Sequence, residues 1–180
     1  MNVQPRFVFR WRSRLGIAVA LFVAWGVLNA FLAIFVPASL HRGGVGAVGG
    51  LVMAAPMDGM LLGRSLDDIG RSDPRLNSYL VTFMDTMCAQ MMSFAILLVG
   101  VTWFGLRRGQ AWALWFAATG SIATFVYYVP IVAEFSRMGV LIDASALVTF
   151  SPIPVILVVA AVGWSGLRAE RAQSAEPPSV

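Results

Sequence analysis

Four long apolar stretches, separated by shorter polar segments, fill most of this 180-residue chain. They cover approximately residues 15–36, 79–106, 110–132 and 144–164. Each meets the length of roughly 20 residues that an α-helix needs to cross about 30 Å of hydrocarbon. The pattern predicts an all-α integral membrane protein, a four-helix bundle that forms one domain over residues 15–166.

The arginines stand at alternate ends of these stretches. Eight arginines lie before the first stretch, between the second and the third, or after the fourth: Arg6, Arg10, Arg12, Arg14, Arg107, Arg108, Arg168 and Arg171. The segment 37–78 instead balances arginine against aspartate. Because positive charge is retained in the cytoplasm, this asymmetry predicts both termini inside, an N-in/C-in topology.

The two chain ends are predicted to differ in role. Residues 1–14 alternate arginine with aromatic side chains and are expected to anchor the chain at the cytoplasmic surface. There Arg6, Arg10, Arg12 and Arg14 would contact anionic lipid headgroups. A basic start also suits a signal peptide, but an apolar run of about 22 residues exceeds the usual 7–15. Residues 167–180 are predicted to form a disordered cytoplasmic tail.

The first outer loop is unusual in composition. Residues 43–63 carry seven glycines among apolar side chains. Such a segment is too flexible to favour a helix and too apolar to float in water, so it is expected to lie on the outer interface or cover the bundle as a lid. Ser65 is then predicted to be the N-cap of a short helix. Asp73-Pro74 reads as a second helix start, at the head of the second span.

Small and polar residues mark one face of three of the predicted spans. Small residues allow close helix approach in lipid, so these faces are predicted to meet inside the bundle. The first span contributes Gly26, Asn29 and Ala33; the second Ser78, Thr82, Asp85, Thr86, Ala89, Ser93 and Gly100; the third Ala113, Ala117, Gly120, Ser121, Thr124 and Tyr128.

Several polar groups are also predicted at one depth, in the outer half of their spans. Pro130, Pro152 and Pro154 would free backbone carbonyls near the same level. We interpret this as either a hydrated packing defect or a small polar pocket open to the outer face. The candidate ligand contacts are Asn29, Asp85, Gln90, Thr124 and Tyr128.

Asp85 is the most informative single residue of this set. An ionised carboxylate at the membrane boundary is costly unless it is paired or hydrated, and Arg64, Arg71, Arg75 and Arg137 are its expected partners. It is thus either one partner of a structural salt bridge or a carboxylate that acts as a proton donor or ligand anchor. Asp85 and Glu134 are the two candidate catalytic acids.

Composition narrows the functions further. Hydrophobic residues make up 58% and charged residues 12%, against roughly 45–50% and 25% in soluble domains. The high pI reflects juxtamembrane arginine, so no nucleic-acid partner is predicted.

One histidine, His41, cannot build a zinc or bis-histidine haem site and is interpreted as an interfacial loop residue. One cysteine, Cys88, excludes an internal disulfide. No metal or cofactor is predicted, and the GxGxxG at 44–49 lacks the strand and helix of a dinucleotide site.

The stretch 103–115, with Arg107-Arg108 between interfacial tryptophans, resembles the inner loop of small, uncharacterised four-helix bacterial inner-membrane proteins. The resemblance implies the bacterial cytoplasmic membrane and carries no activity. The layout is also similar to four-helix sterol isomerases and quinone-linked reductases. This chain lacks the paired cysteines of the reductases, and no histidine lies within a predicted span. The sequence therefore supports neither activity.

Three functions remain open at this point. The first is a non-enzymatic accessory subunit or a protein that binds a lipid or amphipathic ligand, with a membrane protein partner or a second copy of the chain as its other contact. The second is a membrane enzyme acting on a lipid or isoprenoid substrate through Asp85 or Glu134. The third is an oligomeric transporter or channel component, for which four helices with one embedded acid make a poor pathway on their own.

Overall fold

Across residues 9–140 and 150–175, which the computed structural model describes, the chain is helical and contains no strand. Four helices in this part are long and apolar enough to cross a membrane, which confirms the predicted class. The anchor residues 1–8 with Arg6, the predicted start of the fourth span at residue 144, and the last five residues of the tail lie outside the described residues.

The long helices are extended by turns of other geometry. Their bounds are α1 Arg14–Gly43, α4 Pro74–Gly100, α5 Ala111–Val126, α6 Tyr128–Arg137 and α8 Pro152–Ala175. A π-helical turn, η2 Val101–Gly105, and a 3₁₀ turn, η3 Leu106–Arg108, continue α4 to the connection with α5. The third span therefore consists of α5 and α6, which are interrupted at Tyr127, three residues before Pro130.

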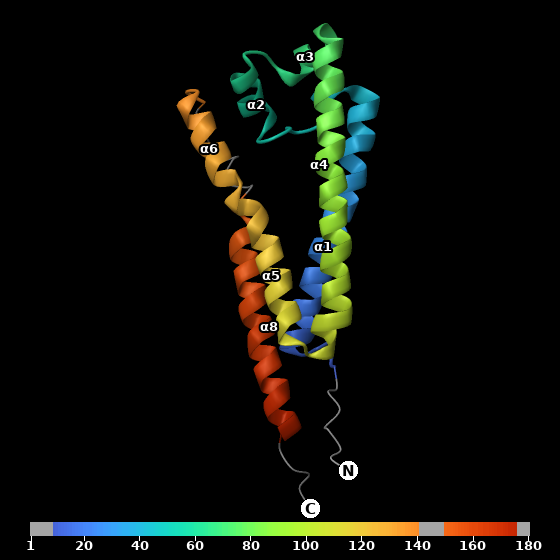
Figure 1. Ribbon diagram of the computed structural model, residues 1–180, viewed down its shortest axis with the longest axis vertical. Coiled ribbons are helices and arrows are strands. Elements are labelled where there is room, and N and C mark those ends of the chain that lie inside the picture. The colour runs from blue at the N-terminus through green and yellow to red at the C-terminus, as the bar shows by residue number, and fades with distance from the viewer. Residues whose placement is uncertain (1–8, 141–149, 176–180) are drawn as a thin grey trace, which may run out of the picture.

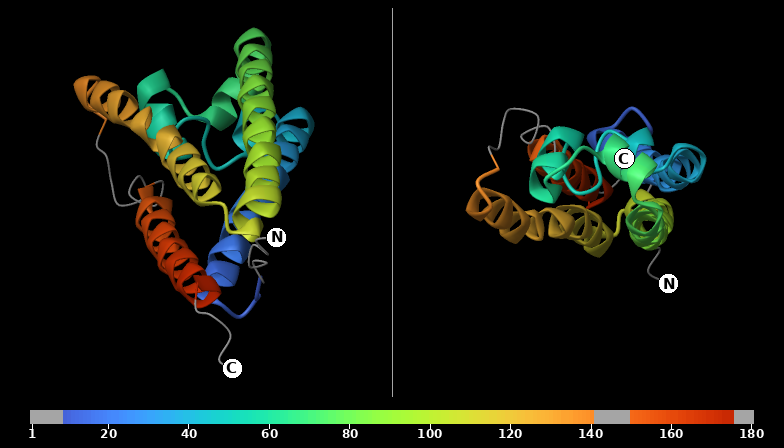
Figure 2. Two further views of the ribbon diagram at one scale, coloured as in Figure 1. Left: turned by 60° about the horizontal axis from the view of Figure 1, so that its bottom comes forward. Right: turned by 90° about the horizontal axis from the view of Figure 1, so that it is seen from above.

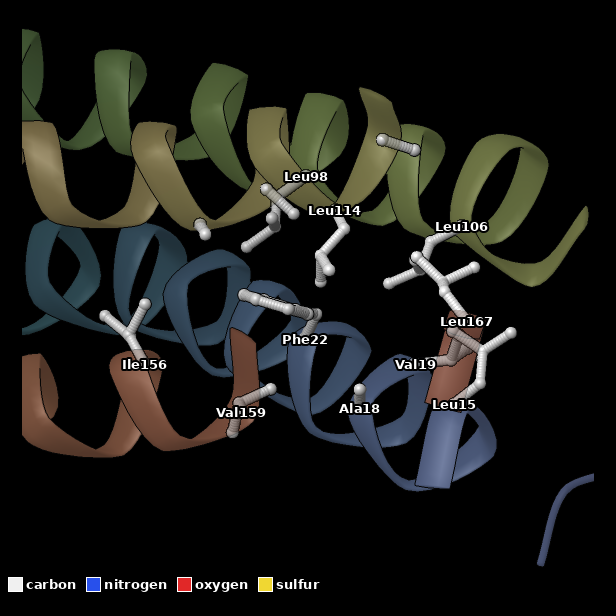
Figure 3. Close-up of a cluster of buried hydrophobic side chains, with 13 residues drawn as sticks. Leu15, Ala18, Val19, Phe22, Leu98, Leu106, Leu114, Ile156, Val159 and Leu167 are labelled. Atoms are coloured by element: carbon white, nitrogen blue, oxygen red, sulfur yellow. The ribbon is translucent and has the colours of Figure 1, made fainter. Parts of the chain in front are cut away.

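The four long helices meet at the end of the molecule where α1 begins and α8 finishes, which we call the closed end (Figure 1). Their main core lies here. Leu15 of α1, Leu106, Leu114 of α5 and Leu167 of α8 are almost completely buried together (Figure 3). Toward the opposite end, α1 and α4 stay side by side while α5 and α6 diverge from them (Figures 1 and 2).

The opposite end, which we call the loop end, is bridged by the segment between α1 and α4 (Figure 1). This segment holds a 3₁₀ turn, η1 Val45–Ala47, and two short helices, α2 Ala55–Leu62 and α3 Leu66–Ser72. Part of it packs on α1 and α4 in one apolar cluster, and Met53 and Met57 pack on Phe135 of α6 in another. A lid over the bundle was one of two expectations for this segment, and this packing agrees with it.

The predicted helix starts in this segment are confirmed. Ser65 caps α3 by accepting the backbone N–H of Asp68 at 3.1 Å. Asp73 caps α4 by accepting the N–H of Leu76 at 3.0 Å, with Pro74 in the first helical position. The glycine-rich part differs from expectation, because residues 55–62 form a helix in spite of Gly59. Burial of Met57 and the ordered turn before it outweigh the weak local helix propensity.

The packing faces agree with the sequence in two spans and differ in one. Gly26 and Ala33 on α1 and Ala113, Ala117 and Ser121 on α5 are buried, as predicted. On α4 the predicted face is mostly exposed, with Asp85 and Gly100 half-buried, and a neighbouring stripe is buried instead. The buried residues of α4 are Val81, Cys88, Ala95 and Leu98.

A local hydrogen-bond pattern explains why this prediction for α4 is wrong. Thr82 donates to the carbonyl of Ser78 at 2.9 Å, Thr86 to that of Thr82 at 3.1 Å, and Ser93 to that of Ala89 at 3.1 Å. Each hydroxyl is satisfied within its own helix, so no cost forces it into the protein interior. The apolar stripe of Val81, Cys88, Ala95 and Leu98 is buried in its place.

The end of α8 also differs from the prediction. The helix continues to Ala175, so the segment 167–180 begins as helix and not as a disordered tail. Arg168 lies over the Trp164 ring at 5.0 Å, and Arg171 donates to the carbonyl of Gly109 at 3.2 Å. Ser13, the N-cap of α1, donates to Glu170 at 2.7 Å. These contacts tie the last turns of α8 to the rest of the closed end.

Candidate ligand site between α1 and α8

A cavity of about 370 Å³ lies between the middle of α1 and the first turns of α8. Its lining comes from residues spaced three or four apart on each helix, which place their side chains on one face. The α1 side is Leu21, Phe22, Ala24, Trp25 and Leu28; the α8 side is Ser151, Pro152, Val155, Ile156 and Val159. The volume falls at the small end of the range of roughly 300–1,000 Å³ that ligand sites occupy.

The walls of this cavity are almost entirely apolar. Among the lining residues only Trp25 and Ser151 carry a polar side-chain group. The indole nitrogen of Trp25 is shielded and has no hydrogen-bond partner in the described part of the chain. Such walls suit an aliphatic or isoprenoid chain and offer no set of groups for acid–base chemistry.

Pro152 and Pro154, which were predicted to free backbone carbonyls near this level, lie instead in the first turn of α8. Pro152 is the first residue of α8, and Pro154 follows two positions later. The N–H groups of a first helical turn have no intrahelical acceptor, so proline costs little there. Pro152 lines the cavity and shapes the start of the helix.

The five predicted ligand contacts do not form one pocket. Within the described residues, no hydrogen bond joins any two of them. Asn29 donates from its side chain to the carbonyl of Trp25 at 2.8 Å, one turn back on α1. Gln90 on α4 and Thr124 on α5 have exposed side chains. Tyr128, at the start of α6, packs its ring near Phe125 and Phe150, with centroids 6.2 and 5.9 Å away.

Asp85 has a partner that the sequence did not suggest. Its Oδ2 lies 2.9 Å from Nε2 of His41, and the four arginines expected as partners are not bonded to it. The second oxygen, Oδ1, is shielded and has no partner in the described chain. The side chains of His41 and Asp85 are 62% and 36% exposed, so the pair lies at the surface of the α1–α4 contact.

His41 reaches Asp85 because α1 is longer than predicted. The helix continues through Pro37 to Gly43, which places His41 in its last turn and not in a loop. A basic pair His41-Arg42 at a helix C-terminus is favoured by the helix dipole, and this signal was available in the sequence.

Glu134, the other candidate acid, lies on the exposed face of α6. In the described part of the chain it pairs with Arg137, three residues later, at 3.5 Å. The two side chains are 59% and 79% exposed. Such a pair contributes little to stability, and no cavity brings a substrate to it.

Asp58, at the loop end, is a residue that sequence reasoning missed. It is 3% exposed, and its carboxylate accepts the backbone N–H groups of Leu51 at 2.6 Å, Val52 at 3.1 Å and Met53 at 3.0 Å. The charge is thereby compensated by three donors, and the carboxylate fixes the turn that precedes α2. The signal was an aspartate within a glycine-rich apolar run, where local carboxylate–backbone turns are common.

The described residues contain no group of three histidine, cysteine, aspartate or glutamate side chains that could hold a metal ion. Comparison with family models, with curated proteins and with solved structures gave no match for this chain.

Proposed function

We propose that this chain is a non-enzymatic, multi-pass protein of the bacterial cytoplasmic membrane that binds an apolar or amphipathic molecule. The observation that carries the proposal is the apolar cavity between α1 and α8. It lies at mid-length of α1, and therefore at the depth of the acyl chains if α1 crosses the bilayer. A lipid tail or isoprenoid chain matches such walls, because an apolar chain carries no polar group that would lose its hydrogen bonds to water on entering the cavity.

The arginines support an orientation with both termini in the cytoplasm. Arg14, Arg107, Arg108, Arg168 and Arg171 belong to the closed end, where α1 begins and α8 finishes. The loop end carries acidic side chains that offset its arginines, such as the pair of Arg64 with Asp73 at 2.8 Å. The positive-inside rule then assigns the closed end to the cytoplasm.

Of the five polar contacts predicted for such a ligand, one lies next to this cavity and four lie on other helices. Asn29 lies one turn from Trp25, toward the loop end, and is the predicted contact that lies nearest in sequence to the cavity. Asp85, Gln90, Thr124 and Tyr128 lie on other helices and do not line it. A headgroup that extends from the cavity toward the loop end would meet Asn29 first.

Native mass spectrometry of protein extracted from its own membrane in mild detergent tests this proposal. The wild-type chain is expected to retain one lipid or isoprenoid molecule. Ala24→Phe fills the cavity and should lower the number of retained molecules by one, while Ala20→Phe, one turn earlier on an exposed position outside the lining, should not change it. Equal retention by all three proteins would exclude the cavity as the binding site.

The His41–Asp85 pair favours a second candidate, a membrane enzyme that acts on a lipid or isoprenoid substrate at the loop end. A carboxylate that holds one imidazole nitrogen leaves the other free to take up or deliver a proton. Asp85→Asn separates the two candidates. A folded variant that still retains its ligand but loses turnover would support the enzyme, and loss of stability alone would assign Asp85 a structural role.

A further inference from the structure

A second pocket, of about 440 Å³, lies at the closed end and shares no lining residue with the α1–α8 cavity. It is lined by Phe9, Trp103, Phe104, Arg107 and Arg108. These residues come from the segment before α1 and from the turns η2 and η3 that follow α4. The pocket therefore combines two guanidinium groups with three aromatic rings.

Arg107 is the centre of this arrangement. Its guanidinium carbon lies 4.5 Å from the ring centroid of Trp103, 5.6 Å from that of Phe9 and 5.9 Å from that of Trp11. These contacts involve the aromatic faces and hold the side chain in place. The N–H donors of a guanidinium point outward in its plane, and no hydrogen bond of Arg107 is found within the described residues, so these donors are available for a bidentate acceptor.

Both arginines of the pocket are without a carboxylate partner in the described part of the chain. The ion pairs found there involve His41, Arg64 and Arg137, all at the loop end. Glu170, a carboxylate at the closed end, is bonded to Ser13. Two neighbouring guanidinium groups that repel each other and have no counter-ion of their own favour binding of an external anion.

The local backbone holds the pocket in shape. A π-helical turn at Val101–Gly105, a geometry that recurs at functional sites, carries Trp103 and Phe104. At Gly105, an added Cβ would lie 2.6 Å from Cβ of Ala113, so α5 packs directly against this turn. The arginines that follow are thereby held between two helices and do not lie on a free loop.

We propose that this arginine–aromatic pocket binds the phosphate group of an anionic lipid headgroup. Guanidinium groups bind phosphate through paired, charge-assisted hydrogen bonds, and basic pockets at the cytoplasmic ends of membrane helices suit anionic headgroups. A soluble phosphate compound shares this chemistry. The lipid is favoured because Phe104 is 64% exposed and continues the apolar outer surface of α4, where Leu97 is 67% exposed. Acyl chains attached to the bound phosphate would lie along that surface.

Native mass spectrometry of the full chain with added phosphatidylglycerol or phosphatidylcholine tests this site. The wild type should retain phosphatidylglycerol selectively. Arg108→Gln and Arg107→Gln should each lower that retention about tenfold, the loss expected for one charged hydrogen-bond donor set. Arg168→Gln removes an equal charge from an exposed position at the same end that does not line the pocket, and it should leave retention unchanged.

Three results would overturn the assignment. Equal loss in Arg168→Gln would show that binding follows the overall surface charge. Unchanged retention in Arg108→Gln would exclude the pocket, and this exposed side chain can be replaced without disturbing packing. Displacement of the lipid by millimolar inorganic phosphate would make a soluble phosphate compound the occupant. The test is independent of the α1–α8 cavity, because Ala24→Phe should leave phosphatidylglycerol selectivity intact.

Discussion

The two ends of this molecule are held together in different ways. At the closed end four helices approach closely through apolar and small side chains, and Leu15, Leu106 and Leu114 have no exposed surface. At the loop end α5 and α6 diverge from α1 and α4, and polar contacts fix the connecting segment together with two small apolar clusters. Asp58 binds three backbone N–H groups there, and Asn77 accepts the N–H of Val45 at 3.0 Å.

The proposed membrane topology accounts for this difference. In lipid, apolar side chains gain nothing by leaving their surroundings, so helix association depends on close packing of small residues. Near water, a loop rich in glycine loses much conformational entropy on folding and needs specific hydrogen bonds to become ordered. Substitutions at the two ends should therefore act by different mechanisms and on different observables.

The largest effect is expected at the closed end, from Gly166→Ala on α8. A Cβ at this position would collide with the backbone nitrogen of Leu15 on α1, and neither backbone can move without displacing a helix. We expect a loss of about 3 kcal/mol in unfolding free energy, the upper part of the range for overpacking. Thermal and denaturant unfolding in detergent measures it.

Gly100→Ala is the matched control for this substitution. It also lies within a membrane-spanning helix, but an added Cβ meets no atom within 4 Å. The expected change is a gain of less than about 1 kcal/mol from helix propensity. If both variants unfold alike, close backbone approach does not stabilise the closed end.

At the loop end, Asp58→Ala should act locally. The substitution leaves three backbone N–H groups without their acceptor, at a cost of about 2–3 kcal/mol. Because α1 and α4 remain packed, global unfolding should change little. Hydrogen exchange of residues 51–53 should accelerate by about a hundredfold, which corresponds to roughly 2.7 kcal/mol. Asp68→Ala, an exposed acid in the neighbouring α3, should leave this exchange unchanged.

Periodicity and charge determine how much of this could be predicted from the sequence. Four spans and the caps at Ser65 and Asp73 follow from local pattern alone, whereas α1 and α8 continue beyond their predicted ends, to Gly43 and Ala175. The buried face of α4 could not be predicted by counting small residues, since Thr82, Thr86 and Ser93 satisfy their hydroxyls within the helix. A helical wheel contains no information on such bonds.

The candidate sites were predictable to different degrees. The polar residues expected to converge are distributed over α1, α4, α5 and α6, since equal depth in the membrane does not imply proximity around the bundle. The α1–α8 cavity is apolar and leaves no motif in the sequence. The His41–Asp85 pair required the true end of α1, and helix ends are the least certain part of any pattern-based reading.

An intermediate effect is expected where α1 and α4 meet at the loop end. The His41–Asp85 pair is partly exposed, so its coupling should be about 0.5–1 kcal/mol. A double-mutant cycle with His41→Gln and Asp85→Asn measures this value in unfolding experiments at neutral and mildly acidic pH. Additive losses from the two substitutions would mean that the contact contributes no coupling energy.

The smallest effect concerns pH at the start of α4. The backbone N–H of Leu76, followed by the Arg64 side chain, lowers the pKa of Asp73 below its ordinary value of 3.8. A carboxyl group with a lowered folded-state pKa stabilises the fold above that ordinary value, and the contribution disappears as pH falls through the folded pKa. Acid unfolding monitored below about pH 4 should therefore be shallower in Asp73→Asn. Arg64→Gln should reduce the slope only in part, because the Leu76 N–H remains.

The central claim, that the α1–α8 cavity binds an apolar chain, is tested most directly by photo-crosslinking in native membranes with a diazirine-bearing fatty acid incorporated into lipid. The account predicts adducts concentrated on residues 21–28 of α1 and 151–159 of α8, and their loss in Ala24→Phe. Adducts spread evenly over exposed apolar positions such as Phe31 and Phe116, and unchanged in that variant, would contradict it.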